Sequence, residues 1–177
     1  MYNQLFLVYV ILMSLSLFLL IITFSSFDVS NIHQEFKDGL PKKFLSNYQI
    51  FIGVMLGLLW LGKISPTLLE RQIPEGLDHY TTLVIQAMDL GFLVPVAILS
   101  GIKIRKNESL GYLLTSLVVV KGSAMLLSIS LMIINMLLHG VEVNIIELIL
   151  FPLMLLLSIY SIIVLLKHIK INKEVTV

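Results

Sequence analysis

Tyr80–Gly101 reads YTTLVIQAMDLGFLVPVAILSG, a segment that is apolar enough to cross a membrane and carries one carboxylate, Asp89, near its middle. A charged side chain inside a bilayer is costly, so it needs a partner of opposite charge or a watery cavity. Lys121 occupies a comparable place in the next apolar segment, SLVVVKGSAMLLSISLMIINM. We therefore expect Asp89 and Lys121 to pair inside the membrane.

The composition indicates a protein whose solvent is lipid. Of its 177 residues, 58% are hydrophobic and 13% are charged, whereas a soluble domain typically has about 45–50% apolar and about 25% charged residues. A net charge of +1, without a basic face, does not favour binding to nucleic acid. The chain has no cysteine, which excludes disulfides, thiolate metal sites and cysteine nucleophiles.

Five segments are long and apolar enough to cross a bilayer, for which a helix needs about 20 residues. The sequence therefore predicts an all-α integral membrane protein with five transmembrane helices in a single domain, 1–177. We expect the last four helices to form a bundle and the first to pack at its edge. The second span is the weakest prediction, because its purely apolar part is short. The predicted spans lie at about 4–24, 44–64, 80–102, 110–138 and 145–166.

The connection between the first two spans carries three apolar residues at helical spacing. Ile32, Phe36 and Leu40 recur every four residues among polar neighbours. This pattern is typical of a short helix that lies in the membrane interface with its apolar side toward lipid. We predict such an interfacial helix at about 30–39, ended by Gly39.

The basic residues predict the orientation, because Lys and Arg are retained on the cytoplasmic side of short loops. With five spans, the first loop, the third loop and the C-terminal tail share one side of the membrane. The sequence thus predicts a multi-pass protein of the plasma membrane with its N-terminus outside and its C-terminus in the cytoplasm. The basic residues in these three segments are Lys37, Lys42, Lys43, Lys103, Arg105, Lys106, Lys167, Lys170 and Lys173.

Polar residues of the third span share one helix face. Asp78, Thr82, Gln86 and Asp89 are separated by four, four and three residues, which places them on one side of a helix that descends from the external surface. A polar stripe is costly against lipid, so we expect it to face other helices or water.

The fourth and fifth spans add polar residues to the same outer half of the membrane. Lys121, Ser128 and Asn135 recur every seven residues, again on one helix face. Glu147 lies in the first turns of the fifth span, and it is expected either to point inward beside Asn135 or to snorkel to water. The predicted ligand- or ion-binding site consists of Asp89, Lys121, Gln86, Thr82, Asn135 and Glu147.

Three other features bear on helix packing. Pro95 and Pro152 lie inside the third and fifth spans and are expected to kink their helices, because proline lacks the N–H that an α-helix needs. Gly53 and Gly57 form a small-xxx-small pair on the second span, which lets another helix approach closely. Trp60, near the end of that span, is expected to lie in the interfacial aromatic belt.

Two functions remain open from these residues. In the first, Asp89 and Lys121 form the floor of an externally open polar site that binds or transports a small solute, a proton or an ion. In the second, their pair is purely structural, and the chain is a membrane scaffold or accessory subunit whose partner is another membrane protein or a second copy. The sequence has no G-x-S-x-G, H-E-x-x-H or P-loop motif, so neither catalysis nor a metal or cofactor is expected.

The chain after about Asp28 resembles a group of small uncharacterised prokaryotic multi-spanning membrane proteins. The resemblance lies in the segments WLGKISPTLLERQIPEGL, YTTLVIQAMDLGFLVPVAILSGI and LGYLLTSLVVVKGSAMLLSISLMIINM. Lys63 stands where an acid is common in that group. The group has no established activity, so the resemblance implies a membrane protein and no function. The matching positions are Trp60, Leu61, Pro66, Asp89, Leu90, Pro95, Gly111, Tyr112 and Lys121.

Overall fold

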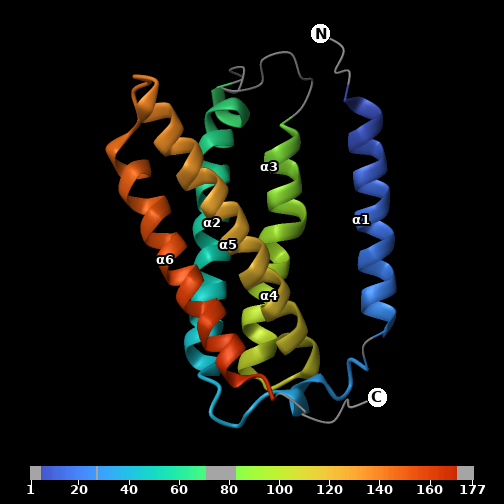
Figure 1. Cartoon of the computed structure of the whole chain (residues 1–177). Coiled ribbons are helices and arrows are strands. Elements are labelled where there is room, and N and C mark those ends of the chain that lie inside the picture. Colours follow the sequence, from blue (N-terminus) through green and yellow to red (C-terminus); the bar gives the residue numbers. More distant parts are fainter. Residues whose placement is uncertain (1–4, 27, 71–82, 171–177) are drawn as a thin grey trace.

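Every regular secondary-structure element in the part of the chain that the structure describes is a helix (Figure 1). The structure is a computed structural model, and it describes residues 5–26, 28–70 and 83–170. Three consecutive elements, α3, η2 and α4, follow one another without a break and form one long helix. The elements are α1 (Phe6–Ser26), the 3₁₀ helix η1 (Ile32–Glu35), α2 (Lys42–Glu70), α3 (Val84–Met88), the π-helical turn η2 (Asp89–Leu93), α4 (Val94–Arg105), α5 (Ser109–Leu138) and α6 (Ile145–His168).

The prediction of five membrane-length helices is confirmed for the described residues. Five helices are long and apolar enough to cross a membrane, and each overlaps one predicted span. Residue 4 and residues 80–82, assigned to the first and third spans, lie outside the described residues. The five helices are Phe6–Ser26, Lys42–Pro66, Val84–Arg105, Ser109–Leu138 and Ile145–His168.

The last four of these helices pack together, and α1 stands beside them (Figure 1). α2 packs against α4, α4 against α5, and α5 against α6. No side chain of α1 is buried. This arrangement agrees with the expected bundle and its peripheral first helix.

Small residues let α2 and α4 approach each other closely. A Cβ atom added at Gly53 would lie 2.8 Å from Cγ1 of Ile98 on α4. One added at Gly101 would lie 2.7 Å from Cγ1 of Ile50 and 2.9 Å from the backbone oxygen of Ser46, both on α2. Helices associate through such close packing in lipid, because lipid tails are as apolar as leucine and supply no hydrophobic driving force.

The segment 28–41 closes one end of the bundle. Its apolar residues Ile32, Phe36 and Leu40 are buried in the hydrophobic core at that end. Helical structure here is limited to the four residues of η1, shorter than the predicted interfacial helix at about 30–39. The spacing of the apolar residues thus reflects burial against the bundle, and their side chains do not face lipid.

Backbone pairing explains why the helix in this segment is short. The amide of Lys37 donates to the carbonyl of His168 at 2.8 Å, and the amide of Lys170 donates to the carbonyl of Glu35 at 2.7 Å. Lys42 Nζ also donates to the side chain of Asn107, in the turn between α4 and α5. The first loop, the third loop and the end of α6 therefore lie at one end of the bundle, which is called the basic end below.

Replacing Gly101 with Ala is expected to destabilise the bundle by about 1–3 kcal/mol, the usual effect of overpacking. The added methyl group meets the backbone of α2, which cannot turn aside as a side chain can. Thermal unfolding in one detergent, followed by circular dichroism, measures the loss.

The matched control is Gly62→Ala on α2, where an added Cβ meets nothing within 4 Å. This change is expected to be neutral or to stabilise the helix by up to about 1 kcal/mol, because alanine is the better helix former. Equal losses of stability in the two variants would contradict the close approach of α2 and α4.

Candidate functional site

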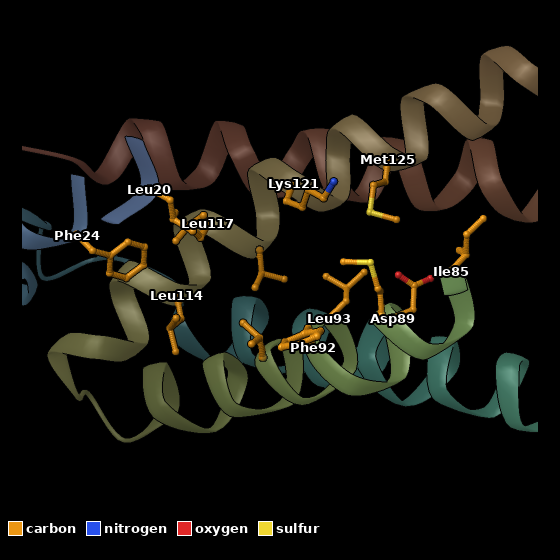
Figure 2. Close-up of a pocket in the computed structure, with 13 residues that line it drawn as sticks. Leu20, Phe24, Ile85, Asp89, Phe92, Leu93, Leu114, Leu117, Lys121 and Met125 are labelled. Atoms are coloured by element: carbon orange, nitrogen blue, oxygen red, sulfur yellow. The ribbon is translucent and has the colours of Figure 1, made fainter. Parts of the chain in front are cut away.

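A cavity of about 540 Å³ lies between α1, the continuous helix α3–η2–α4, and α5 (Figure 2). This volume falls within the range of about 300–1,000 Å³ that is typical of small-molecule sites. Apolar side chains form most of its wall, such as Phe24 of α1, Phe92 of η2 and Leu117 of α5. Asp89 and Lys121 are the polar residues among the described residues that line it.

The position of Asp89 depends on an irregular turn of helix. Asp89 is the first residue of the π-helical turn η2, and Pro95 follows shortly after that turn ends. Pro95 has no N–H to donate to the carbonyl four residues before it, so regular α-helical bonding is broken there. The π turn lies directly before this break, and the kink expected at Pro95 stays a prediction. Such turns recur at functional sites, where the extra residue redirects a side chain.

The carboxylate of Asp89 is held from α2 by Trp60. The indole Nε1 of Trp60 donates a hydrogen bond of 2.9 Å to Asp89 Oδ2. The ammonium of Lys63 lies 5.7 Å from the centroid of the Trp60 ring, a cation–π distance. A hydrogen bond to a charged group typically contributes about 1.5–3 kcal/mol. Trp60 thus ties α2 to the start of η2, and its expected place in the interfacial aromatic belt stays a prediction.

Contrary to the expectation from sequence, Asp89 and Lys121 do not form an ion pair. In residues 5–26, 28–70 and 83–170, the one ion pair joins Lys103 and Glu108, and its hydrogen bond lowers the pKa of the Glu108 carboxyl. Asp89 is held toward α2, whereas Lys121 lies on the exposed side of α5. Lys121 has neither a hydrogen bond nor an ion pair with any described residue.

The structure does not gather the other predicted site residues in this cavity. Gln86 is half-buried on α3 and is not among the residues that line the cavity. Asn135 and Glu147 are both exposed, on α5 and in the first turn of α6. Thr82, like Asp78, lies outside the described residues. Among the predicted site residues that the structure describes, only Asp89 and Lys121 share a cavity.

The interior of the bundle is joined by neutral polar groups that the sequence reasoning missed. The buried hydroxyl of Ser100 on α4 donates to Gln49 Oε1 on α2 at 2.8 Å, and Gln49 Nε2 donates to the carbonyl of Thr115 on α5 at 3.4 Å. Ser123 of α5 and Ser158 of α6 are also hydrogen-bonded to each other. One signal was available in the sequence, because Gln49 lies four residues before Gly53 on the face of α2 that packs closely.

Neither the second cavity of the described residues nor their acidic and histidine side chains add to the site. A second cavity of about 90 Å³ lies inside the bundle beside Tyr48 and Gln49, below the size typical of ligand sites. No group of three or more His, Asp or Glu side chains in the described ranges is placed to hold a metal ion.

Trp60 is the one tryptophan of the chain, so its fluorescence reports directly on its contact with Asp89. Asp89→Leu removes the acceptor and is expected to shift the emission maximum of Trp60. Lys121→Met is expected to leave the emission unchanged, since Lys121 does not contact this pair. Emission spectra of the purified variants in one detergent provide the measurement. A shift of equal size in Lys121→Met would contradict the absence of contact and support the Asp89–Lys121 pair expected from the sequence.

Comparison with known proteins gives no family for this chain. No protein-family model matches it, and no curated protein or solved structure matches it either. The resemblance drawn from the sequence therefore stays a prediction, and the geometry of the cavity is what supports a function.

Proposed function

We propose that this chain is an integral membrane protein that binds a small lipophilic or amphiphilic molecule in the cavity between α1, α3–η2–α4 and α5. The observation that carries the proposal is an apolar cavity of about 540 Å³ with one carboxylate and one ammonium group on its wall. Ligand sites typically combine a mostly apolar lining with a few placed polar groups. Because Asp89 and Lys121 are not in direct contact, a bound molecule can satisfy both.

Access from the lipid distinguishes this proposal from the externally open polar site expected from the sequence. α1 forms one wall of the cavity and has no buried side chain, so acyl chains can reach the cavity beside it. Asp89 and Lys121 are the only polar residues of the described lining, so these two residues alone do not make a polar path for an ion or solute. We therefore propose binding from the bilayer, without transport.

The proposed orientation places the basic end of the bundle in the cytoplasm of a plasma-membrane protein. The backbone bonds between the segment 28–41 and the end of α6 bring most of the basic residues to that end. Lys and Arg are retained on the cytoplasmic side during insertion. The N-terminus then lies outside.

An accessory-subunit function is the second candidate, and the exposure of α1 favours it. No residue of this helix is fully buried, and most are exposed, so α1 is available to another membrane protein or to a second copy of the chain. A partner's helix would then occupy the space beside Asp89 and Lys121, and no small molecule would bind.

The orientation predicts which positions an impermeant thiol reagent can reach. Because the chain has no cysteine, single cysteines can be placed at Lys43, Lys106 and Glu142. Labelling of intact cells is expected at Glu142→Cys alone, with Lys43→Cys and Lys106→Cys reacting only after the membrane is opened. Labelling of Lys106→Cys in intact cells would contradict the proposed orientation and support the opposite one.

Filling the cavity is expected to abolish binding without unfolding the protein. Val96→Phe extends a larger side chain into the cavity from α4. Native mass spectrometry after purification in mild detergent is expected to show one bound membrane-derived molecule on the original chain. Its occupancy should fall at least about tenfold in Val96→Phe, a loss of about 1.4 kcal/mol.

The matched control is Leu99→Phe, three residues further along α4, where the side chain is 48% exposed and does not line the cavity. This variant is expected to retain the bound molecule. If Val96→Phe and Leu99→Phe retain it equally, the cavity is not the binding site, and the accessory-subunit function is favoured.

A further inference from the structure

The two polar residues of the cavity lie away from the basic end, with Ile85 and Met125 beside them. Figure 2 shows Phe24 and Leu114 toward the turn that joins α4 and α5, and Asp89 toward the opposite end. Lys121 lies twelve residues into α5, about 18 Å from its first residue by helical rise. A molecule with a polar head and an apolar chain fits this distribution, with its head at Asp89 and Lys121 and its chain directed toward the basic end.

The charge of the two residues limits the charge of the head group. Asp89 and Lys121 together have no net charge when both are ionised. A head group with a net charge would leave one uncompensated charge at this depth in the membrane, which is unfavourable, and a zwitterionic head group would bring two further charges out of water into a lining that is otherwise apolar. The site therefore favours an uncharged head group.

The hydrogen-bonding groups of the site limit the head group further. Asp89 accepts one bond from Trp60 at Oδ2, and its Oδ1 has no partner among the described residues. An ionised carboxylate is an acceptor only, and an ammonium group is a donor only. A head group that satisfies both must supply a donor to Asp89 and an acceptor to Lys121.

We infer that the cavity binds an uncharged, single-chain amphiphile whose head group carries a hydroxyl donor and an oxygen acceptor, as a monoacylglycerol does. The hydroxyl donates to Asp89 Oδ1, and a hydroxyl or ester oxygen accepts from Lys121 Nζ. The inference rests on the proposed function, since it assigns the class of ligand to the same cavity. It commits to a molecule drawn from the bilayer, because the rest of the described lining is apolar.

Four probes with the same chain length test the head group. They are monopalmitoylglycerol, which has donor and acceptor; methyl palmitate, which has only an acceptor; hexadecyl sulfonate, a fixed anion; and hexadecyltrimethylammonium, a fixed cation. Delipidated protein in a non-ionic detergent is titrated with each probe, and occupancy is read by native mass spectrometry. Monopalmitoylglycerol is expected to bind roughly tenfold or more tightly than the other three, each tenfold being about 1.4 kcal/mol.

Two charge variants make the expectation specific to Asp89 and Lys121. Asp89→Asn leaves Lys121 as the single charge and is expected to shift the preference toward the sulfonate. Lys121→Met leaves Asp89 and is expected to shift it toward the trimethylammonium probe. The double variant is expected to bind the two charged probes equally weakly. Trp60 fluorescence checks that Asp89→Asn keeps its contact with α2, because the asparagine amide oxygen can still accept the indole bond.

The outcomes separate this inference from the proposed function on which it rests. If Val96→Phe blocks every probe but the original chain binds all four equally, the cavity binds amphiphiles and the head-group inference is overturned. A preference that stays the same in Asp89→Asn and Lys121→Met overturns it as well. If no probe binds, or if Val96→Phe binds as the original chain does, the proposed function fails with it.

Discussion

The close approach of α2 and α4 joins the two helical segments that position the carboxylate of the site, since Trp60 belongs to α2 and Asp89 to the helix that continues into α4. Gly53 and Gly101 remove the side chains that would hold these two backbones apart. Lipid tails do not drive helices together by the hydrophobic effect, so a membrane bundle depends on such close packing and on hydrogen bonds between helices. The same contact brings the end of α2 beside η2, where Trp60 can donate to Asp89.

Neutral polar groups and charged groups occupy different parts of the molecule. Hydroxyl and amide groups form hydrogen bonds between helices in the interior of the bundle, where Ser100 and Gln49 are both essentially inaccessible. Ser123 also donates to the carbonyl of Val119 four residues earlier on α5, whereas the buried hydroxyls of Ser46 and Thr115 have no partner among the described residues. A buried ion pair needs near-ideal geometry to repay the loss of solvation. Asp89 and Lys121 instead line a cavity at the edge of the bundle, where a ligand can contact them.

The basic end of the bundle is closed by its own chain. Phe36 lies over the ring of Tyr112, with ring centroids 5.1 Å apart, and Lys42 lies 5.8 Å from the same ring. These contacts bury the segment between α1 and α2, while α1 itself remains unpacked. The cavity therefore has one side made by the packed bundle and one side formed by α1, of which no residue is buried.

Local sequence alone determined the helical class of the protein, the number of membrane-length helices and the gathering of basic residues at one end. Each of these follows from residues close together in the chain, since a span requires only a run of apolar residues and alternating spans bring alternate loops to the same side. The close packing predicted for the Gly53 and Gly57 pair is a local signal of low specificity; it is met at Gly53, while a Cβ at Gly57 would make only an ordinary contact, 3.5 Å from Val94 Cγ1.

Only the tertiary structure decided how the polar groups are paired. The seven-residue spacing of Lys121, Ser128 and Asn135 showed that they share a face of α5, but whether that face points inward depends on how α5 packs against α4 and α6. Asp89 begins the π turn, which lies beside α2, and its carboxylate therefore accepts a hydrogen bond from Trp60 instead of pairing with Lys121. Helical spacing fixes which residues of one helix lie together, whereas contacts between helices depend on how each helix is rotated against its neighbours, which spacing within a single helix does not determine.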